Sequence, residues 1–362
     1  MSPISKSAIY ILLTMVCKHA IAQDADTIKK NNLHLSGYLE TYYCYDFSKP
    51  ANHLREPYFY NFNKHNEVNL DIGMVKVNYT SKKVRTNLAF MAGTYPQYNM
   101  ANEQRLLRNI FEANAGVKIS NKNNLWIDAG IMPSHIGFES AIGKDCWNLT
   151  RSLLSETTPF YENGVRLNYT SNNEKLYLAI YYLNGWQRIQ KIKNNHTPAF
   201  GTQITYKPST NTLLNWSTYI GNEQPNSLTK WRYFNNFYGQ FQLTKKLGLI
   251  AGFDIGIQQH RGILNTISGF DKWYSPVLII KYAPTSKTSI AARAEYYSDK
   301  NGVIISSVKG FQTFGYSSNF DYVLSENSLF RIEGRILSSK EKNFNSNSNK
   351  NYFITTSLAI SF

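Results

Sequence analysis

Segments of alternating apolar and polar residues recur along this chain, and the connections between them alternate between two lengths. A period of two is typical of a β-strand whose two faces meet different surroundings, and it is clear in residues 33–43. Short polar turns such as 81–83 and 244–246 alternate with longer connections such as 139–162. Transmembrane β-barrels have this asymmetry, with short periplasmic turns and long extracellular loops. We therefore predict an all-β chain that forms a transmembrane, up-and-down antiparallel β-barrel of about 16 strands.

The same pattern places the individual strands and the long connections. Strands are expected at 33–43, 66–80, 84–95, 111–120, 125–138, 163–170, 175–186, 199–207, 212–222, 233–243, 247–258, 273–283, 287–298, 311–323, 328–338 and 352–362. Long connections are expected at 46–65, 96–110, 139–162, 187–198, 223–232, 259–272, 299–310 and 339–351. The phase of 66–80 changes near Gly73–Val75, which indicates a β-bulge.

Aromatic side chains gather near both ends of the expected strands. At the short-turn ends, in phase with the apolar faces, they are Tyr79, Tyr169, Tyr206, Tyr282 and Tyr322. Near the long connections they are Tyr43, Tyr95, Tyr182, Trp231, Trp273 and Tyr296. Amphipathic rings at two levels are typical of the interfacial girdles of a membrane barrel. Five tyrosines recur at the same end and on the same face of their strands. This recurrence favours an interfacial girdle over the aromatic residues that are common in any β-strand.

The first 22 residues are typical of a secretory signal peptide. Lys6 supplies the positive charge, 8–16 is the apolar run, and Ala20-Ile21-Ala22 is the cleavage site. The apolar run is too short to cross a bilayer as a helix. We therefore expect a cleaved signal peptide at 1–22, a short N-terminal segment at 23–32, and a barrel at 33–362 in the cell outer membrane.

Charged residues on the expected strands alternate with the apolar faces. Side chains that face lipid must be apolar, so the charged faces are expected to line the barrel interior. The basic residues assigned inward are Lys76, Arg85, Lys118, Arg166, Lys207, Lys281, Arg293, Arg331 and Arg335. The acidic residues assigned inward are Glu40, Glu67, Asp71, Glu112, Asp128, Asp254, Glu295, Asp321 and Glu333. The two sets balance, so the net charge of +15 resides mainly in turns and loops. A barrel of this strand number leaves an aqueous channel.

Two charge patterns lie on nearby inward faces, two strands apart. They are Arg293-x-Glu295 and Arg331-x-Glu333-x-Arg335. Such an ion ladder could create a transverse field that orders permeating solutes. It could equally be a charge network that braces the wall. The residues alone leave both interpretations open.

The longest connection, 139–162, carries four charged candidates for a constriction. They are Lys144, Asp145, Arg151 and Glu156. If this loop entered the barrel, its charges would set the size and charge limits of the pore. A solvent-facing loop is the alternative. A disulfide between Cys44 and Cys146 could pin the loop inward, but two free thiols are the default expectation.

The last expected strand ends in Phe362. A final strand with a terminal Phe resembles the signal that the outer-membrane assembly machinery of Gram-negative bacteria uses. We therefore expect as partners the barrel assembly machinery, outer-membrane lipid and lipopolysaccharide, and small solutes. A homotrimer is left open. Nucleic acid is not expected as a partner, despite the basic charge, because the chain is expected to be exported.

Several segments resemble a known family. They are Ala129-Gly-Ile-Met-Pro-Ser-His-Ile-Gly-Phe-Glu-Ser140, Asn148-Leu-Thr-Arg-Ser152, Pro159-Phe-Tyr-Glu-Asn-Gly-Val165, Asn184-Gly-Trp-Gln187 and Ala292-Arg-Ala-Glu-Tyr-Tyr-Ser-Asp299. In this order they resemble the putative β-barrel porin-2 family of outer-membrane proteins. The resemblance covers essentially the whole chain after the signal peptide. It implies a passive outer-membrane channel and names no substrate.

These observations favour a porin through which small hydrophilic solutes diffuse passively. The alternatives are a substrate-selective channel, for anions or short sugars, and a non-conducting structural or adhesive barrel. The enzyme motifs G-x-S-x-G, H-E-x-x-H and C-x-x-C do not occur in the sequence. We therefore expect no enzymatic activity, no cofactor and no metal ion.

Overall fold

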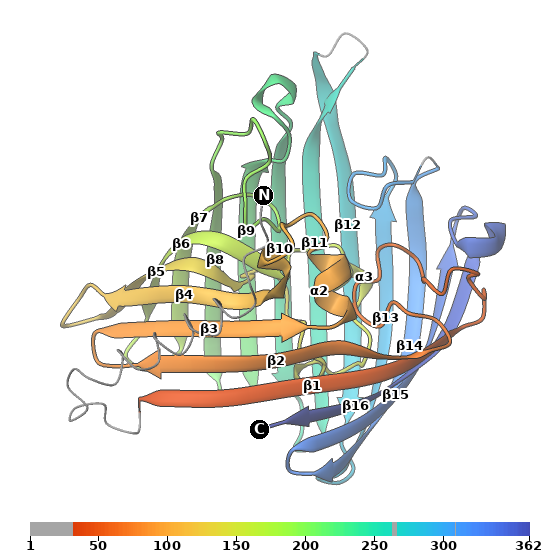
Figure 1. The fold of residues 1–362 in the computed structure, drawn as a ribbon, viewed down its shortest axis with the longest axis horizontal. Helices are drawn as coiled ribbons and strands as arrows, with labels where there is room; N and C mark the ends of the chain where they lie inside the picture. Colours follow the sequence, from red (N-terminus) through yellow and green to blue (C-terminus); the bar gives the residue numbers. More distant parts are fainter. Residues whose placement is uncertain (1–31, 263–265, 308) are drawn as a thin grey trace, which may run out of the picture.

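The computed structural model describes residues 32–262, 266–307 and 309–362. Those residues form sixteen β-strands, each paired antiparallel with the next, and β16 returns to pair with β1 (Figure 1). Closure satisfies the backbone groups that an open sheet edge would present to lipid. The predicted fold class and strand number are confirmed. The expected signal peptide and residues 23–31 lie outside the described residues.

The strand bounds follow the predicted pattern with local differences. The strands are β1 (Leu33–Asp46), β2 (Val68–Thr80), β3 (Val84–Ala92), β4 (Ile110–Lys118), β5 (Asn124–Pro133), β6 (Tyr161–Thr170), β7 (Leu176–Leu183), β8 (Ala199–Ser209), β9 (Thr212–Asn222), β10 (Trp231–Gln242), β11 (Leu247–Arg261), β12 (Ile267–Tyr282), β13 (Thr288–Asp299), β14 (Phe311–Ser325), β15 (Ser328–Ser339) and β16 (Lys350–Ser361). The helices are α2 (Thr94–Asn99) and α3 (Leu153–Glu156), with 3-10 turns η1 (Leu107–Asn109), η2 (Gly143–Asp145), η3 (Asn226–Leu228) and η4 (Asn345–Asn347).

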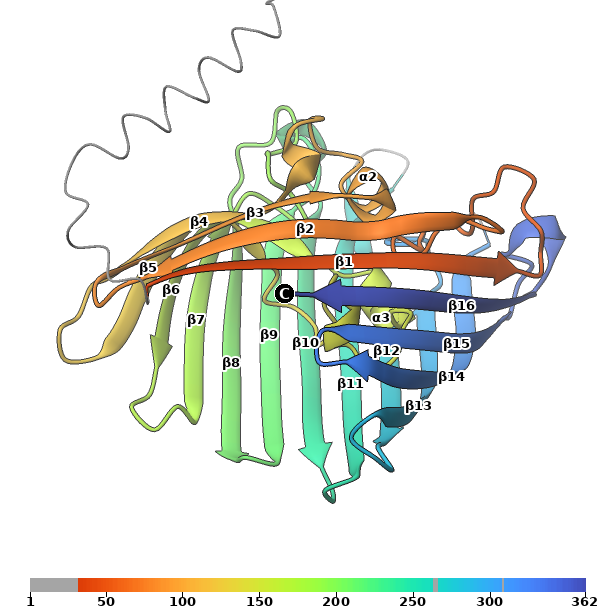
Figure 2. The ribbon, with the colours of Figure 1, turned by 60° about the horizontal axis from the view of Figure 1, so that its bottom comes forward.

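The barrel closes along the seam between β1 and β16, which lie side by side in Figure 2. Their register runs from Tyr38 opposite Ser361 to Asp46 opposite Phe353. Gly37 extends the seam, because its N–H donates to the Phe362 carbonyl at 2.8 Å. The Phe362 ring lies over Gly37, and a Cβ atom at this position would displace the ring.

Side chains alternate across the wall as a period of two requires. On β14, Phe314 and Tyr316 are about half exposed on the outer face, whereas Asn319 is buried inside. On β1, Leu39 is exposed outward and Glu40 is buried inward. The outer surface therefore carries the apolar belt that hydrocarbon requires, and polar groups face the lumen.

Several expected positions need correction. The strand expected at 84–95 ends at Ala92, and Tyr95 in α2 and Trp273 on β12 are buried, so neither belongs to an outer girdle. The connection expected at 259–272 is reduced to 262–266, because β11 and β12 extend beyond the apolar pattern as a paired hairpin. The bulge lies earlier than Gly73–Val75: the β1–β2 register passes from Ile72 to Leu70 and leaves Asp71 as the extra residue. The expected strand 125–138 ends at Pro133, so the third long connection runs over 134–160. We call this connection L3.

L3 enters the barrel, where α3 lies inside the ring of strands (Figures 1 and 2). Leu149, Leu153 and Leu154 in L3 are fully buried. Cys146 in L3 and Cys44 on β1 are both buried free thiols, so the disulfide that the sequence left open is not formed. Among the described residues, no helix has the length and hydropathy needed to cross a bilayer.

Candidate channel constriction

The predicted ion ladder forms on the inner faces of β13 and β15. Arg335 Nη2 lies 2.5 Å from Glu295 Oε1, and Arg293 Nη2 lies 3.0 Å from Glu333 Oε1. The strands are separated by β14, so these side chains must reach across it. Gly315 on β14 makes this possible, because a Cβ there would lie 2.5 Å from Glu295 Oε1.

The acidic members of the ladder accept hydrogen bonds from the backbone of L3. Glu333 accepts from the amide and hydroxyl of Thr150, at 2.6 and 2.9 Å. Glu295 accepts from the Leu153 amide at 2.6 Å. Hydrogen bonds to a charged group are among the stronger ones, at about 1.5–3 kcal/mol each. The wall carboxylates therefore hold L3 at the start of α3.

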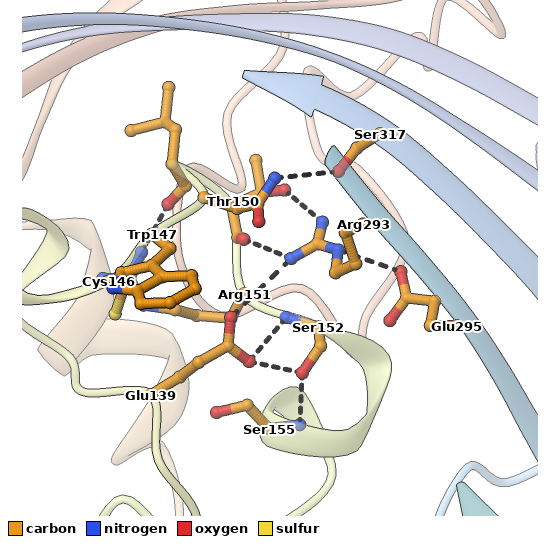
Figure 3. A network of polar contacts seen from close by, with 12 residues as sticks. Glu139, Cys146, Trp147, Thr150, Arg151, Ser152, Ser155, Arg293, Glu295 and Ser317 are labelled. Carbon is orange, nitrogen blue, oxygen red and sulfur yellow. Dashed lines mark hydrogen bonds and ion pairs between the residues drawn. The ribbon is translucent and has the colours of Figure 1, made fainter. Parts of the chain in front are cut away.

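The arginines of the ladder donate to L3 carbonyls. Arg293 Nη1 donates to the Thr150 carbonyl at 2.6 Å (Figure 3), and Arg335 Nη1 donates to the Arg151 carbonyl at 2.8 Å. Arg331 Nη1 donates to the Gly143 carbonyl at 2.7 Å, and its Nε lies 2.7 Å from Asp321 on β14. These arginines are at most 2% exposed. Of the two interpretations left open, this geometry favours a network that braces L3.

L3 is also held together internally (Figure 3). Glu139 Oε2 accepts from the Ser152 amide at 2.9 Å and also from its hydroxyl. The Ser152 hydroxyl in turn accepts from the Ser155 amide and caps α3. Arg151 Nε donates to the Ser140 carbonyl at 2.6 Å, which draws the two arms of the loop together. Burial raises the pKa of Glu139 despite the nearby Arg293.

The four charged candidates of L3 occupy different surroundings. Arg151 and Glu156 are buried inside the loop, and Glu156 accepts from the Tyr60 amide at 3.1 Å. Lys144 and Asp145 are exposed at η2 and face the short-turn side of the lumen. The structure therefore brings two of the four to the packed part of L3 and leaves two on its surface.

A second cluster lies on the wall formed by β3, β5 and β6. Asp128 is buried and contacts both Arg85, with Nη2 at 2.5 Å, and Arg166, with Nη2 at 3.0 Å. Asn168 Nδ2 donates to the same carboxylate at 2.6 Å. About a quarter of each arginine side chain is exposed, so this cluster presents positive charge to the lumen.

Several other assigned residues lie outside these clusters. Glu40 is buried and accepts from the hydroxyls of Tyr38 and Ser357, both at 2.8 Å. Glu112 pairs with Lys76 at 2.5 Å. Asp254 accepts from Asn236 Nδ2 at 2.5 Å and is buried, and Lys118 is half-buried at the end of β4.

Two cavities lie on opposite sides of L3. The larger, of about 760 Å³, is bounded by Phe160, Lys144 and the short turn that contains Glu326. The smaller, of about 270 Å³, is bounded by Glu156–Thr158 and by residues from several long loops. No described residue lines both cavities. L3 therefore separates a short-turn vestibule from a long-loop vestibule.

The sequence pattern did not indicate a role for His135, which the structure places in a buried network. Its Nδ1 lies 2.8 Å from Glu162, and its Nε2 lies 2.8 Å from the Thr218 carbonyl. Burial opposes protonation of the ring, but Glu162 and the Thr218 carbonyl outweigh it and raise the pKa of His135. It stacks on Tyr181 with 4.2 Å between ring centroids. Its place in the segment 129–140, which carries the family resemblance, was the available signal.

Comparison with known families settles the relationship of this chain. A family model described as "Putative beta-barrel porin-2, OmpL-like" matches residues 32–362. The chain belongs to this family. The resemblance seen in the sequence is thus confirmed, and the protein is a porin, a channel of the outer membrane. Its short-turn rim is accordingly periplasmic and its long-loop rim extracellular.

Three solved structures with a similar fold are an outer-membrane channel, a porin and an outer-membrane protein. The channel DcaP of Acinetobacter baumannii matches with a TM-score of 0.61 and 12% identity, over 91% of this chain and 97% of that one. The anion-selective porin from Comamonas acidovorans matches with a TM-score of 0.59 and 8% identity, over 91% and 99%. The trimer form of OmpT of Vibrio cholerae matches with a TM-score of 0.57 and 9% identity, over 91% and 99%. A comparison with curated proteins found no match.

Proposed function

We propose that this porin is a passive diffusion channel for small hydrophilic solutes and that L3 is its constriction. The observation that carries the proposal is the position of L3 between two vestibules, with its backbone held by Glu295, Glu333 and the wall arginines. A solute that crosses the barrel must pass this loop. Size and charge limits would therefore be set by L3 and by the wall opposite it.

The wall opposite the ladder carries the accessible charge. Asp128 neutralises only part of the charge on Arg85 and Arg166, and both arginines are partly exposed. The ladder itself is fully buried against L3 and presents no free charge. We infer a weak preference for anions, superimposed on general permeability.

Single-channel conductance in a planar bilayer under a salt gradient tests this function. We expect discrete steps with a small reversal potential of the sign that favours anions. Deleting 144–149 from L3 should increase the step size, because it removes most of η2 and the segment that follows it in the lumen. A deletion of equal length in the extracellular connection 340–349 is the matched control. An unchanged step size in the L3 deletion would place the constriction elsewhere.

A non-conducting structural barrel is the second candidate. It is favoured by the near-complete burial of Arg331, Arg335 and Glu333, which shows how tightly L3 fills that side of the lumen. A correctly folded, heat-modifiable barrel that gives no conductance steps would support this candidate and contradict the channel.

We also infer a homotrimer embedded in outer-membrane lipid and lipopolysaccharide, and assembled by the barrel assembly machinery from an exported precursor. The support is the apolar outer belt of the barrel and the trimer form of the similar OmpT structure. Mass measurement of the purified protein in nanodiscs tests the oligomeric state. A monomeric mass would contradict the trimer.

A further inference from the structure

The extracellular vestibule contains an unusual buried cation, Arg232, at the start of β10. Its guanidinium lies over the rings of Trp186 and Trp273, with 5.0 and 5.6 Å to the ring centroids. Its Nε and Nη2 donate to the same neutral acceptor, Gln258 Oε1, at 3.0 and 2.7 Å. Arg232 is only 7% exposed and lines the cavity of about 270 Å³.

In the part of the chain that the structure describes, no carboxylate lies within 4.0 Å of Arg232, and Asp299 interacts with it only from a greater distance. A buried charge without a partner is costly, and cation–π contacts offset only part of that cost. Among the other buried arginines of the lumen, Arg293 and Arg335 have carboxylate partners, whereas Arg151 donates to carbonyls of L3. The vestibule therefore contains a guanidinium group that no carboxylate engages directly and that an anionic ligand could contact.

Arg188 in the connection 184–198 lines the same cavity and adds a second positive charge. Its side chain is half-buried, and within the described ranges it has no hydrogen bond or ion pair of its own. Two guanidinium groups on one small cavity, both without carboxylate partners, favour an oxyanion. Their planar donors match a carboxylate in a bidentate geometry.

The acidic groups around the vestibule are already engaged. Glu223 accepts from the Trp186 amide at 3.1 Å and from the Tyr219 hydroxyl. Asp299 accepts from three backbone amides, including Val303 at 2.8 Å and Ile304 at 2.7 Å. Glu156 faces the cavity from L3 and accepts from the backbone of the first extracellular connection. None of these three carboxyl groups lies within 4.0 Å of the guanidinium group of Arg188 or Arg232.

The other lining residues indicate the size and the polarity of the ligand outside its carboxylate. The volume lies near the lower limit of small-molecule pockets, which are about 300–1,000 Å³. Trp186 and Tyr58 offer aromatic surface, while Asn102, Thr157 and Gln224 offer amide and hydroxyl groups. Aromatic surface with many short polar groups suits a compact, hydroxylated molecule.

We propose that this extracellular vestibule is a binding site for a small hydroxylated carboxylate, of the sugar-acid class, anchored by Arg232 and Arg188. The site deepens the proposed channel function, because it would gather such solutes directly above L3. Its occupancy does not require conduction, so binding and permeation can be tested separately.

Calorimetric titration of the full-length folded protein in nanodiscs with sodium glucuronate tests the site. Glucose, of similar shape and without the carboxylate, is the ligand control. We expect saturable binding of glucuronate that weakens with added salt, and at least a tenfold weaker response to glucose. Inorganic phosphate in a parallel titration separates a carboxylate site from a general oxyanion site.

The variant series uses Arg232→Gln, Arg232→Lys and Arg188→Gln. Loss of a charged hydrogen-bond donor should weaken glucuronate binding about 10- to 100-fold in Arg232→Gln and by a smaller factor in Arg188→Gln. Arg232→Lys should bind at an intermediate level, because Lys keeps the charge and loses the planar fork. Arg105→Gln is the matched control, because Arg105 is exposed at the same rim and lies outside the cavity. Heat-modifiable migration verifies that each variant folds.

Equal binding of glucuronate and glucose, or equal binding by wild type and Arg232→Gln, would overturn the proposal. Binding of phosphate without glucuronate would overturn the sugar-acid class. Binding in a protein that does not conduct would leave the site standing and contradict the channel function. Conduction without binding would contradict the site alone.

Discussion

Glu333 on β15 accepts two hydrogen bonds from Thr150, one from its amide at 2.6 Å and one from its hydroxyl at 2.9 Å. The same carboxylate pairs with Arg293, which in turn donates to the Thr150 carbonyl. The amide, the hydroxyl and the carbonyl of Thr150 therefore all form hydrogen bonds with two wall side chains, Glu333 and Arg293. This arrangement fixes where L3 crosses the lumen.

Replacing Glu333 by Gln should loosen L3. The amide keeps one acceptor but removes the charge that balances Arg293, and breaking a buried ion pair costs about 3–5 kcal/mol. We expect a lower temperature for loss of heat-modifiable migration and noisier, larger conductance steps. Glu341→Gln, which alters an extracellular carboxylate without a side-chain partner among the described residues, is the control. Steps identical to those of the wild type would contradict the role of Glu333.

Replacing Asp128 by Asn should shift ion selectivity towards anions. The change leaves Arg85 and Arg166 without their shared counter-ion, and both side chains are about one quarter exposed to the lumen. The measurement is the reversal potential in a salt gradient, which should move in the anion-selective direction. Glu174→Gln removes an exposed charge from a periplasmic turn and should leave the potential unchanged. A shift towards cations would refute this assignment of the pore wall.

Stability should fall as pH rises through neutrality because of Glu156. Burial raises the pKa of this carboxyl from 4.5 to about 7, against the backbone hydrogen bond from Tyr60. The folded state therefore binds a proton that the unfolded state releases, and the contribution is complete below about pH 4.5 and lost as pH rises through 7. Its size is on the order of 3 kcal/mol.

Glu156→Gln should remove this dependence between pH 5 and 8, because the amide does not titrate. The check is the unfolding temperature of the wild type and the variant across that range. Parallel pH profiles for the two proteins would show that Glu156 does not carry the effect.

Deleting Phe362 should impair assembly in cells more than it impairs stability. The residue adds backbone hydrogen bonds to Gly37, each worth about 0.5–1.5 kcal/mol, and its ring is 70% exposed. We expect a reduced folded fraction in the outer membrane and nearly normal refolding in micelles. Phe362→Tyr keeps the aromatic ring and should restore insertion. Normal insertion of the deletion variant would rule out the terminal signal.

The barrel could be predicted because the features that indicate it lie within short segments of the sequence. Alternation along 33–43 and the parity of connection lengths both follow from a wall with one apolar face, and both are visible in short windows. The hairpin of β11 and β12 was underestimated because its outermost residues are polar and pair above the apolar belt. Arg232 was missed for a related reason, since the pattern placed it in the connection 223–232 although β10 begins at Trp231.

The partners of the inward charges could not be predicted. The period of two assigns Arg293, Glu295 and Arg335 to the inner face, but their contacts depend on where L3 lies. The position of L3 results from packing between segments that are distant in the chain, and such packing produces no repeating pattern in the sequence. The sequence therefore predicts which charges are inside, and only the structure shows that the ladder holds a loop.

The hydrogen bonds between L3 and strands β13, β14 and β15 join residues that are 142 to 188 positions apart in the chain. Contacts of such separation carry a large loop-closure entropy and are typical of slow folding. Because β13 and β15 follow L3 in sequence, the backbone groups of Thr150 and Leu153 gain their wall partners only when these late strands are in place. A nascent barrel that lacks its last strands therefore cannot fix the start of α3 in the lumen.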